Sequence, residues 1–155
     1  MKKAAFLLSL FFISVVASAQ GIDFSGSWKI NNSKSKLNDQ FSMAPKAIII
    51  AQKANELNIE RHSEFQGQEF TSNDKLTLDG LECINPGFMD TQKKSTAVWA
   101  DDKSSLKIAN KISMGDGNDM TIVEVYKLDG DTLVIQSDAS SSFGDLSETM
   151  VYDKQ

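Results

Sequence analysis

Residues 106–135 read LKIANKISMGDGNDMTIVEVYKLDGDTLVI, and this stretch decides the fold. Apolar residues recur at every second position in three successive segments, a period typical of half-buried strands. Gly115-Asp116-Gly117-Asn118 separates the first two segments, and Asp129-Gly130-Asp131 separates the last two. Gly130 permits the positive φ that a tight hairpin turn requires. The stretch therefore predicts three consecutive antiparallel strands in a meander.

The same two-residue alternation extends toward both ends of the chain. It recurs at residues 24–30, 56–63, 95–99 and 149–154. A continuous apolar run at 47–51 suits a buried strand, and Asn85-Pro86-Gly87 predicts a turn. We count about nine or ten strands and no sustained helical period after residue 20, which excludes βαβ units.

Such a strand series forms either a sandwich or a barrel. We favour the barrel, because a meander that closes on itself leaves no exposed edges. The predicted fold class is all-β, an antiparallel up-and-down meander barrel of about 8–10 strands.

The N-terminal residues carry the pattern of a secretory signal peptide. Two lysines precede an apolar run at residues 4–16, and Ala17-Ser18-Ala19 supplies the small-x-small cleavage pattern. The run is too short to span a bilayer comfortably, although a retained membrane anchor is the alternative. No cysteine stands at the cleavage point to carry a lipid. The sequence predicts a signal peptide over residues 1–19 and one exported domain over residues 20–155, soluble in the periplasm or the extracellular medium.

Charge and cysteine content narrow the range of partners. The net charge is −5 and becomes more negative when the two lysines of the leader are removed. This balance argues against nucleic acid and anionic membranes as partners, since both require a basic surface. Cys83 is the only cysteine, so no intramolecular disulfide can form and stability must come from the hydrophobic core. Its neighbours Leu81 and Ile84 indicate a buried thiol.

Several motifs resemble those of a known family of barrels. Gly26 and Trp28 form the Gly-x-Trp pattern that opens the first strand of lipocalins and fatty-acid-binding proteins. Residues 124–135 resemble the late hairpin of small exported bacterial lipocalin-like proteins, and Tyr152 matches the aromatic residue of their closing strand. The motif also has a physical meaning of its own. Gly26 lets another segment approach closely, and Trp28 covers one end of the barrel as part of its core.

The resemblance implies a cavity for a small apolar or amphipathic ligand, which a barrel of this size can hold. In fatty-acid binders an Arg-x-Tyr pair on the final strand grips the ligand carboxylate. This chain has Met150-Val151-Tyr152 at the matching place, so the arginine is missing and only the tyrosine carries over.

Charged residues in phase with apolar ones are candidates for a ligand site. Arg61, the only arginine, falls in phase with Leu57 and Ile59, so an inward guanidinium would need a carboxylate from the protein or from a ligand. It could instead reach water at the end of its strand. If Glu124 also faces inward, the two would form an internal ion pair that lines a polar pocket. The predicted ligand-binding residues are Arg61, Trp99, Ile108, Glu124, Tyr126 and Tyr152.

Catalytic and metal motifs are missing from the sequence. His62 is the only histidine, and no second histidine or cysteine completes a zinc site. No Gly-x-Ser-x-Gly motif marks a nucleophile. We therefore expect neither an enzyme nor a metal or cofactor. The sequence favours an exported binding protein that holds a small apolar or amphipathic ligand, and the alternative is an envelope protein–protein interaction module with a filled barrel.

Overall fold

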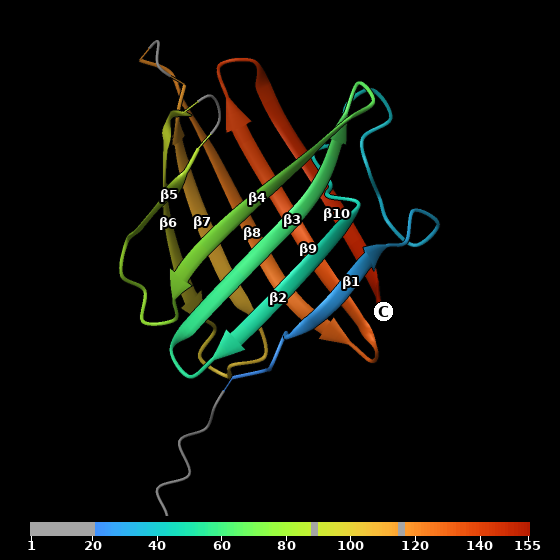
Figure 1. Ribbon diagram of the computed structural model, residues 1–155, viewed down its shortest axis with the longest axis vertical. Coiled ribbons are helices and arrows are strands. Elements are labelled where there is room, and N and C mark those ends of the chain that lie inside the picture. The colour runs from blue at the N-terminus through green and yellow to red at the C-terminus, as the bar shows by residue number, and fades with distance from the viewer. Residues whose placement is uncertain (1–20, 88–89, 115–116) are drawn as a thin grey trace, which may run out of the picture.

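The computed structural model describes residues 21–87, 90–114 and 117–155 (Figure 1). These residues form ten β-strands and contain no α-helix. The strands are β1 (Gly26–Ile30), β2 (Ala47–Lys53), β3 (Glu56–Phe65), β4 (Gln68–Thr77), β5 (Cys83–Pro86), β6 (Gln92–Trp99), β7 (Leu106–Ser113), β8 (Asp119–Asp129), β9 (Thr132–Ser141) and β10 (Gly144–Lys154). Within this part of the chain, no helix is long and apolar enough to cross a membrane. The predicted signal peptide, residues 1–19, lies outside the described residues.

All ten strands belong to one antiparallel sheet with the order β4-β3-β2-β1-β10-β9-β8-β7-β6-β5. Strands that follow one another along the chain pair with each other, except at the seam between β4 and β5. The short strand β1 joins the two halves of the sheet, because it pairs with both β2 and β10. Figure 1 shows the sheet wrapped into a barrel, with β2 to β4 crossing in front of β7 to β9. The predicted all-β meander barrel is confirmed.

The hydrophobic core lies inside the barrel, because alternate residues of each strand face inward. Its fully buried apolar side chains include Phe24, Leu57, Ile59, Leu106, Ile108, Tyr126, Leu133 and Tyr152. In β2, Ile48 and Ile50 are buried, but Ile49 between them is 43% exposed. The apolar run at 47–51 is therefore a half-exposed strand and not the buried one predicted, since the outer face of β2 meets water.

Aromatic residues close one end of the barrel. The ring of Phe24 stacks on Trp99 at a centroid distance of 5.8 Å. The indole Nε1 of Trp28 donates a hydrogen bond to the backbone carbonyl of Phe24 at 3.0 Å, and Lys154 Nζ lies 5.5 Å from the centre of the indole. Gly26 has a φ of 143°, and a Cβ there would lie 3.2 Å from Lys154 Cε. We call this end, where β1 begins, the closed end.

A side chain bridges the seam between β4 and β5, where no backbone ladder joins the described residues. Asn85 Oδ1 accepts a hydrogen bond from the Lys75 backbone N–H at 2.8 Å, and Asn85 Nδ2 donates to the Lys75 carbonyl at 3.1 Å. Asn85 and Pro86 belong to β5, opposite Lys93 and Gln92 of β6, so the turn predicted to begin at Asn85 is wrong. Proline is tolerated there because β5 is an edge strand and Pro86 ends it.

Residues 31–46, which we call the strap, connect β1 to β2 and run beside β10, with which they form a bridge between Lys36 and Thr149. The strap contains turns but no helix. Lys36 exchanges two backbone hydrogen bonds with Thr149 of β10, at 2.7 and 2.9 Å. The buried carboxylate of Glu148 accepts hydrogen bonds from the backbone N–H groups of Asn38 and Met43, at 2.9 and 3.1 Å. These contacts fix both ends of the strap near the end of the barrel opposite the closed one, which we call the open end.

Candidate functional site

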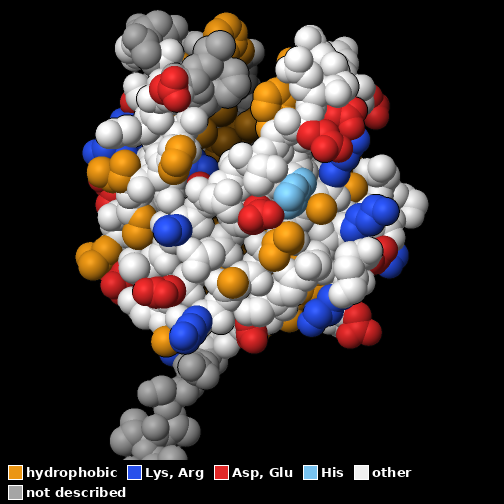
Figure 2. Space-filling view, in the orientation of Figure 1, with side chains coloured by type: hydrophobic (Ala, Val, Ile, Leu, Met, Phe, Trp, Pro, Cys, Tyr) orange, Lys and Arg blue, Asp and Glu red, His pale blue; other side chains and the backbone are white. Residues whose placement is uncertain are grey.

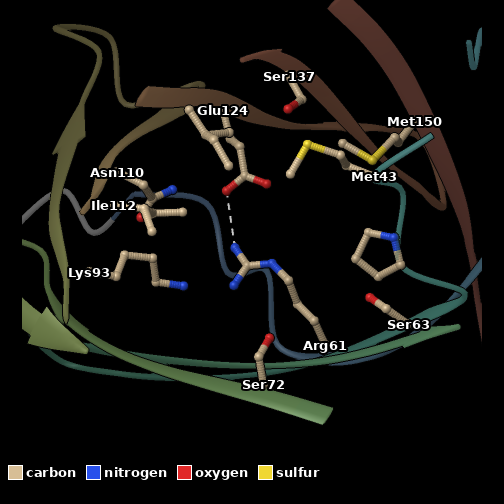
Figure 3. Close-up of a pocket in the computed structure, with 12 residues that line it drawn as sticks. Met43, Arg61, Ser63, Ser72, Lys93, Asn110, Ile112, Glu124, Ser137 and Met150 are labelled. Atoms are coloured by element: carbon tan, nitrogen blue, oxygen red, sulfur yellow. Dashed lines mark hydrogen bonds and ion pairs between the residues drawn. The ribbon is translucent and has the colours of Figure 1, made fainter. Parts of the chain in front are cut away.

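A cavity of about 190 Å³ lies at the open end of the barrel. Figure 2 shows the molecule hollowed between its two upper tips, with hydrophobic side chains in the depth of the hollow. Strands from all around the barrel contribute to the cavity, and the strap adds two side chains (Figure 3). Its lining residues are Met43, Pro45, Arg61, Ser63, Ser72, Lys93, Asn110, Ile112, Ile122, Glu124, Ser137 and Met150.

Arg61 is the centre of the polar part of the cavity. The alternation of β3 turns it inward beside the buried Leu57 and Ile59. Its Nη2 donates hydrogen bonds to Glu124 Oε2 at 3.0 Å and to the hydroxyl of Tyr126 at 2.9 Å. Its Nη1 forms an ion pair with Asp74 of β4. The predicted internal ion pair between Arg61 and Glu124 is therefore confirmed.

A second cation reaches the same carboxylate from across the seam. Lys93 Nζ on β6 lies 2.6 Å from Asp74 Oδ1 and 2.8 Å from Asp74 Oδ2. The Oδ1 atom has no hydrogen bond of good geometry, but this ion pair compensates its charge. Arg61, Asp74, Lys93, Glu124 and Tyr126 together form what we call the polar floor. Sequence reasoning missed Asp74 and Lys93, although both lie in phase with inward-facing neighbours on their strands.

The polar floor is charge-balanced, with two cations against two carboxylates. Burial alone would lower the pKa of Arg61, but its interactions with Tyr126, Glu124 and Asp74 outweigh this and raise the pKa well above its ordinary value. Arg61 therefore remains a cation. Burial also raises the pKa of Tyr126, so this residue keeps its proton and can donate to Glu124.

The predicted ligand-binding residues occupy different parts of the barrel. Arg61 and Glu124 line the cavity, and Tyr126 lies beneath them, buried, in a T-shaped contact with the ring of Phe24. The other three lie away from this cavity lining. Ile108 is fully buried in the core, Trp99 stacks at the closed end, and Tyr152 is buried on β10. Ligand contact by any of the six stays a prediction.

Tyr152 connects the barrel wall to the strap. Its hydroxyl donates a hydrogen bond to the Pro45 carbonyl at 3.1 Å and lies 3.5 Å from Met150 Sδ. Pro45 and Met150 both line the cavity. Tyr152 thus supports the cavity wall from behind. A role for Tyr152 in gripping a ligand carboxylate stays a prediction.

The described residues offer no group of three or more His, Cys, Asp or Glu side chains that could hold a metal ion. His62 lies on the outer face of β3, where its Nε2 is 2.7 Å from Glu60 Oε1. Cys83 is half-buried and not buried as predicted, because it lies on the edge strand β5, with its Sγ 3.6 Å from Thr77 Oγ1.

The nearly closed antiparallel barrel of ten strands has a fatty-acid-binding-protein-like fold. Two solved structures are similar to this chain. The zebrafish ileal bile-acid-binding protein in complex with cholic acid has a TM-score of 0.57 and 14% identity, over 85% of this chain and 98% of that one. Fatty-acid-binding protein 1 of Echinococcus granulosus has a TM-score of 0.55 and 13% identity, over 84% and 96%. At this identity the likeness establishes the fold alone.

No family model and no curated protein matches the sequence. The barrel expected from the resemblance at Gly26, Trp28 and Tyr152 is found at the level of the fold. Membership among small bacterial lipocalin-like proteins stays a prediction.

Proposed function

We propose that this protein is a non-enzymatic binding protein that holds one small amphipathic molecule in the cavity at the open end. The observation that carries the proposal is the composition of the cavity. Apolar side chains, among them Met43, Ile112, Ile122 and Met150, line the same cavity as the charged side chains of Arg61, Lys93 and Glu124. An amphipathic molecule fits such a site with its apolar part against these side chains and its polar group at the floor.

The two similar proteins support this reading. One protein is a bile-acid-binding protein complexed with cholic acid, and the other is a fatty-acid-binding protein. Both names describe small amphipathic ligands. Burial of apolar ligand surface would supply affinity at about 25 cal/mol per Å², and the flexible methionines can adapt to the ligand's shape. The cavity is smaller than the roughly 300–1,000 Å³ typical of ligand pockets, which favours a compact ligand.

We further propose that the protein acts outside the cytoplasm. The support is the leader pattern at residues 1–19 with its Ala17-Ser18-Ala19 cleavage motif. Expression of the full chain in a bacterial host, followed by N-terminal sequencing of the periplasmic fraction, tests this. We expect a mature protein that begins at Gln20. A chain that keeps Met1 and stays in the cytoplasm would contradict export.

Titration with Nile red, an uncharged apolar fluorophore, tests ligand binding directly. We expect saturable binding of one molecule per chain. Ile122→Phe should weaken the binding, because it places a larger side chain in the cavity. Val123→Phe is the matched control, since it adds the same ring on the outer face of the same strand. No saturable binding, or an equal loss in both variants, would contradict the proposal.

An interaction module with a filled barrel is the second candidate. The observation that favours it is a set of exposed aromatic side chains around the open end: Phe41, Phe65, Phe70 and Phe143. The same titration separates the two functions, because a filled barrel would not bind the fluorophore at a single site.

A further inference from the structure

We propose that the cavity selects ligands whose polar head donates a hydrogen bond without carrying a negative charge, such as a hydroxyl or an ammonium group, and that it discriminates against carboxylates. This inference rests on the proposed function, and it names the ligand class of the same site. The cations of the polar floor are already paired, the buried charges include an excess carboxylate, and one carboxylate oxygen is free to accept.

Both cations of the polar floor are committed to carboxylates of the protein. Arg61 uses Nη1 on Asp74 and Nη2 on Glu124 and the Tyr126 hydroxyl. Lys93 contacts both oxygens of Asp74. A ligand carboxylate would compete with Asp74 and Glu124 for the positive charge of Arg61. A carboxylate of the protein that lost its cation in this way would be buried unpaired, which is strongly unfavourable.

The balance of buried charge points the same way. Among the described residues, three carboxylates are less than one-tenth exposed: Asp74, Glu124 and Glu148. The two inward cations are Arg61 and Lys93, whose side chains are 11% and 12% exposed. A carboxylate ligand would bring a further negative charge into this interior, whereas an uncharged or cationic head would not.

Glu124 offers an acceptor that the protein leaves unused. Within the described part of the chain, its hydrogen bonds from Arg61 and Tyr126 both arrive at Oε2. No described residue donates to Oε1, although Glu124 is only 8% exposed and lines the cavity. Figure 3 shows Glu124 reaching into the cavity, with one oxygen joined to Arg61 and the other directed toward the methionines. A hydroxyl or ammonium hydrogen would satisfy this oxygen.

A series of ligands with one chain and three heads tests the inference on the unmodified protein. Octanol, octylammonium and octanoate each compete with Nile red at neutral pH. We expect octanol and octylammonium to displace the fluorophore at concentrations at least about tenfold lower than octanoate does. Octanoate binding as tightly as either of the others would overturn the inference while leaving the proposed function intact. A chain that shows no saturable Nile red site would overturn both.

Glu124→Gln tests which residue sets the preference. The substitution keeps the size of the side chain but leaves Arg61 without one of its carboxylates. We expect the affinity for octanoate, relative to octylammonium, to rise at least about tenfold. Glu60→Gln is the matched control, because it removes one carboxylate from the outer face of β3. An equal change in both variants would overturn the role of Glu124, and the ligand series decides alone if Glu124→Gln does not fold.

Discussion

Both tyrosines of the chain, Tyr126 and Tyr152, are buried inside the barrel. Burial raises the pKa of each phenol above its ordinary value near 10, because the phenolate would lose its hydration. The unfolded chain therefore releases these protons near pH 10 while the folded chain holds them. Above about pH 10 the unfolded state binds fewer protons, so the free energy of unfolding must fall as the pH rises.

We expect no tyrosinate absorbance from the folded protein until it unfolds. An alkaline titration followed by tyrosinate absorbance and tryptophan fluorescence should give coincident transitions. The chain unfolded in urea is the control and should titrate near pH 10. Tyrosinate that forms before the fluorescence changes would show that at least one of the two phenols is accessible.

Arg61 carries the second prediction at the scale of a residue. Arg61→Ala removes a cation that pairs with Asp74 and Glu124, and it leaves Glu124 without an ion pair. We expect a loss of about 3–5 kcal/mol in the free energy of unfolding, measured by urea denaturation. Lys46→Ala, which breaks an exposed pair with Glu64, should cost less than about 1 kcal/mol. Similar losses in the two variants would contradict a buried role for Arg61.

At the scale of the element, the strand β5 pairs with β6 through its backbone but contacts β4 through side chains, chiefly that of Asn85. The amide of Asn85 is 5% exposed and replaces a peptide group across the seam, where it satisfies both the N–H and the C=O of Lys75. Asn85→Ala would leave two backbone groups unpaired. We expect a loss of about 1–3 kcal/mol in stability and faster hydrogen exchange at the Lys75 amide.

Asn58→Ala is the control for the seam, since Asn58 is exposed on the outer face of β3. Its stability should change by no more than about 0.5 kcal/mol. Hydrogen exchange at Lys75 that stays as slow in Asn85→Ala as in this control would mean that the seam holds without the side chain.

The edge strand β5 was harder to predict from the sequence than the strands inside the sheet. Strands such as β3 and β8 were predictable because one face meets water and the other the core, which imposes the two-residue period. The second half of β5 was predicted as a turn, because an edge strand can hold Asn85 and Pro86, residues otherwise typical of turns. The inward direction of Arg61 followed from its phase. The inward direction of its partner Asp74 could not be predicted. Residues 68–73 of β4 are all exposed, so no alternation of buried and exposed positions leads up to Asp74.

Contacts across the barrel were the least predictable part of the site. Short turns between neighbouring strands predict which strands pair. The ion pair between Glu124 and Arg61 could be predicted because each residue is in phase with apolar residues on its own strand. The ion pair between Lys93 and Asp74 spans the seam, where no backbone ladder between the described residues sets a register. The strap also lacks a period, so nothing in its sequence indicated that Met43 and Pro45 would line the cavity.

For the whole molecule, the two ends of the barrel differ in packing. Phe24 at the closed end is fully buried between Trp99 and Tyr126, whereas Phe143 at the open end is 86% exposed. Stability should therefore reside at the closed end, and the open end should be free to exchange ligand.

Alanine substitution at each end tests this asymmetry. Phe24→Ala would leave a void beneath the polar floor, and we expect it to cost about 3–5 kcal/mol in the free energy of unfolding. Phe143→Ala removes the same ring from solvent and should change stability by no more than about 0.5 kcal/mol. Urea denaturation of both variants measures the difference. Comparable losses would mean that the open end also packs as a core, and a barrel filled at both ends would have no room for the ligand.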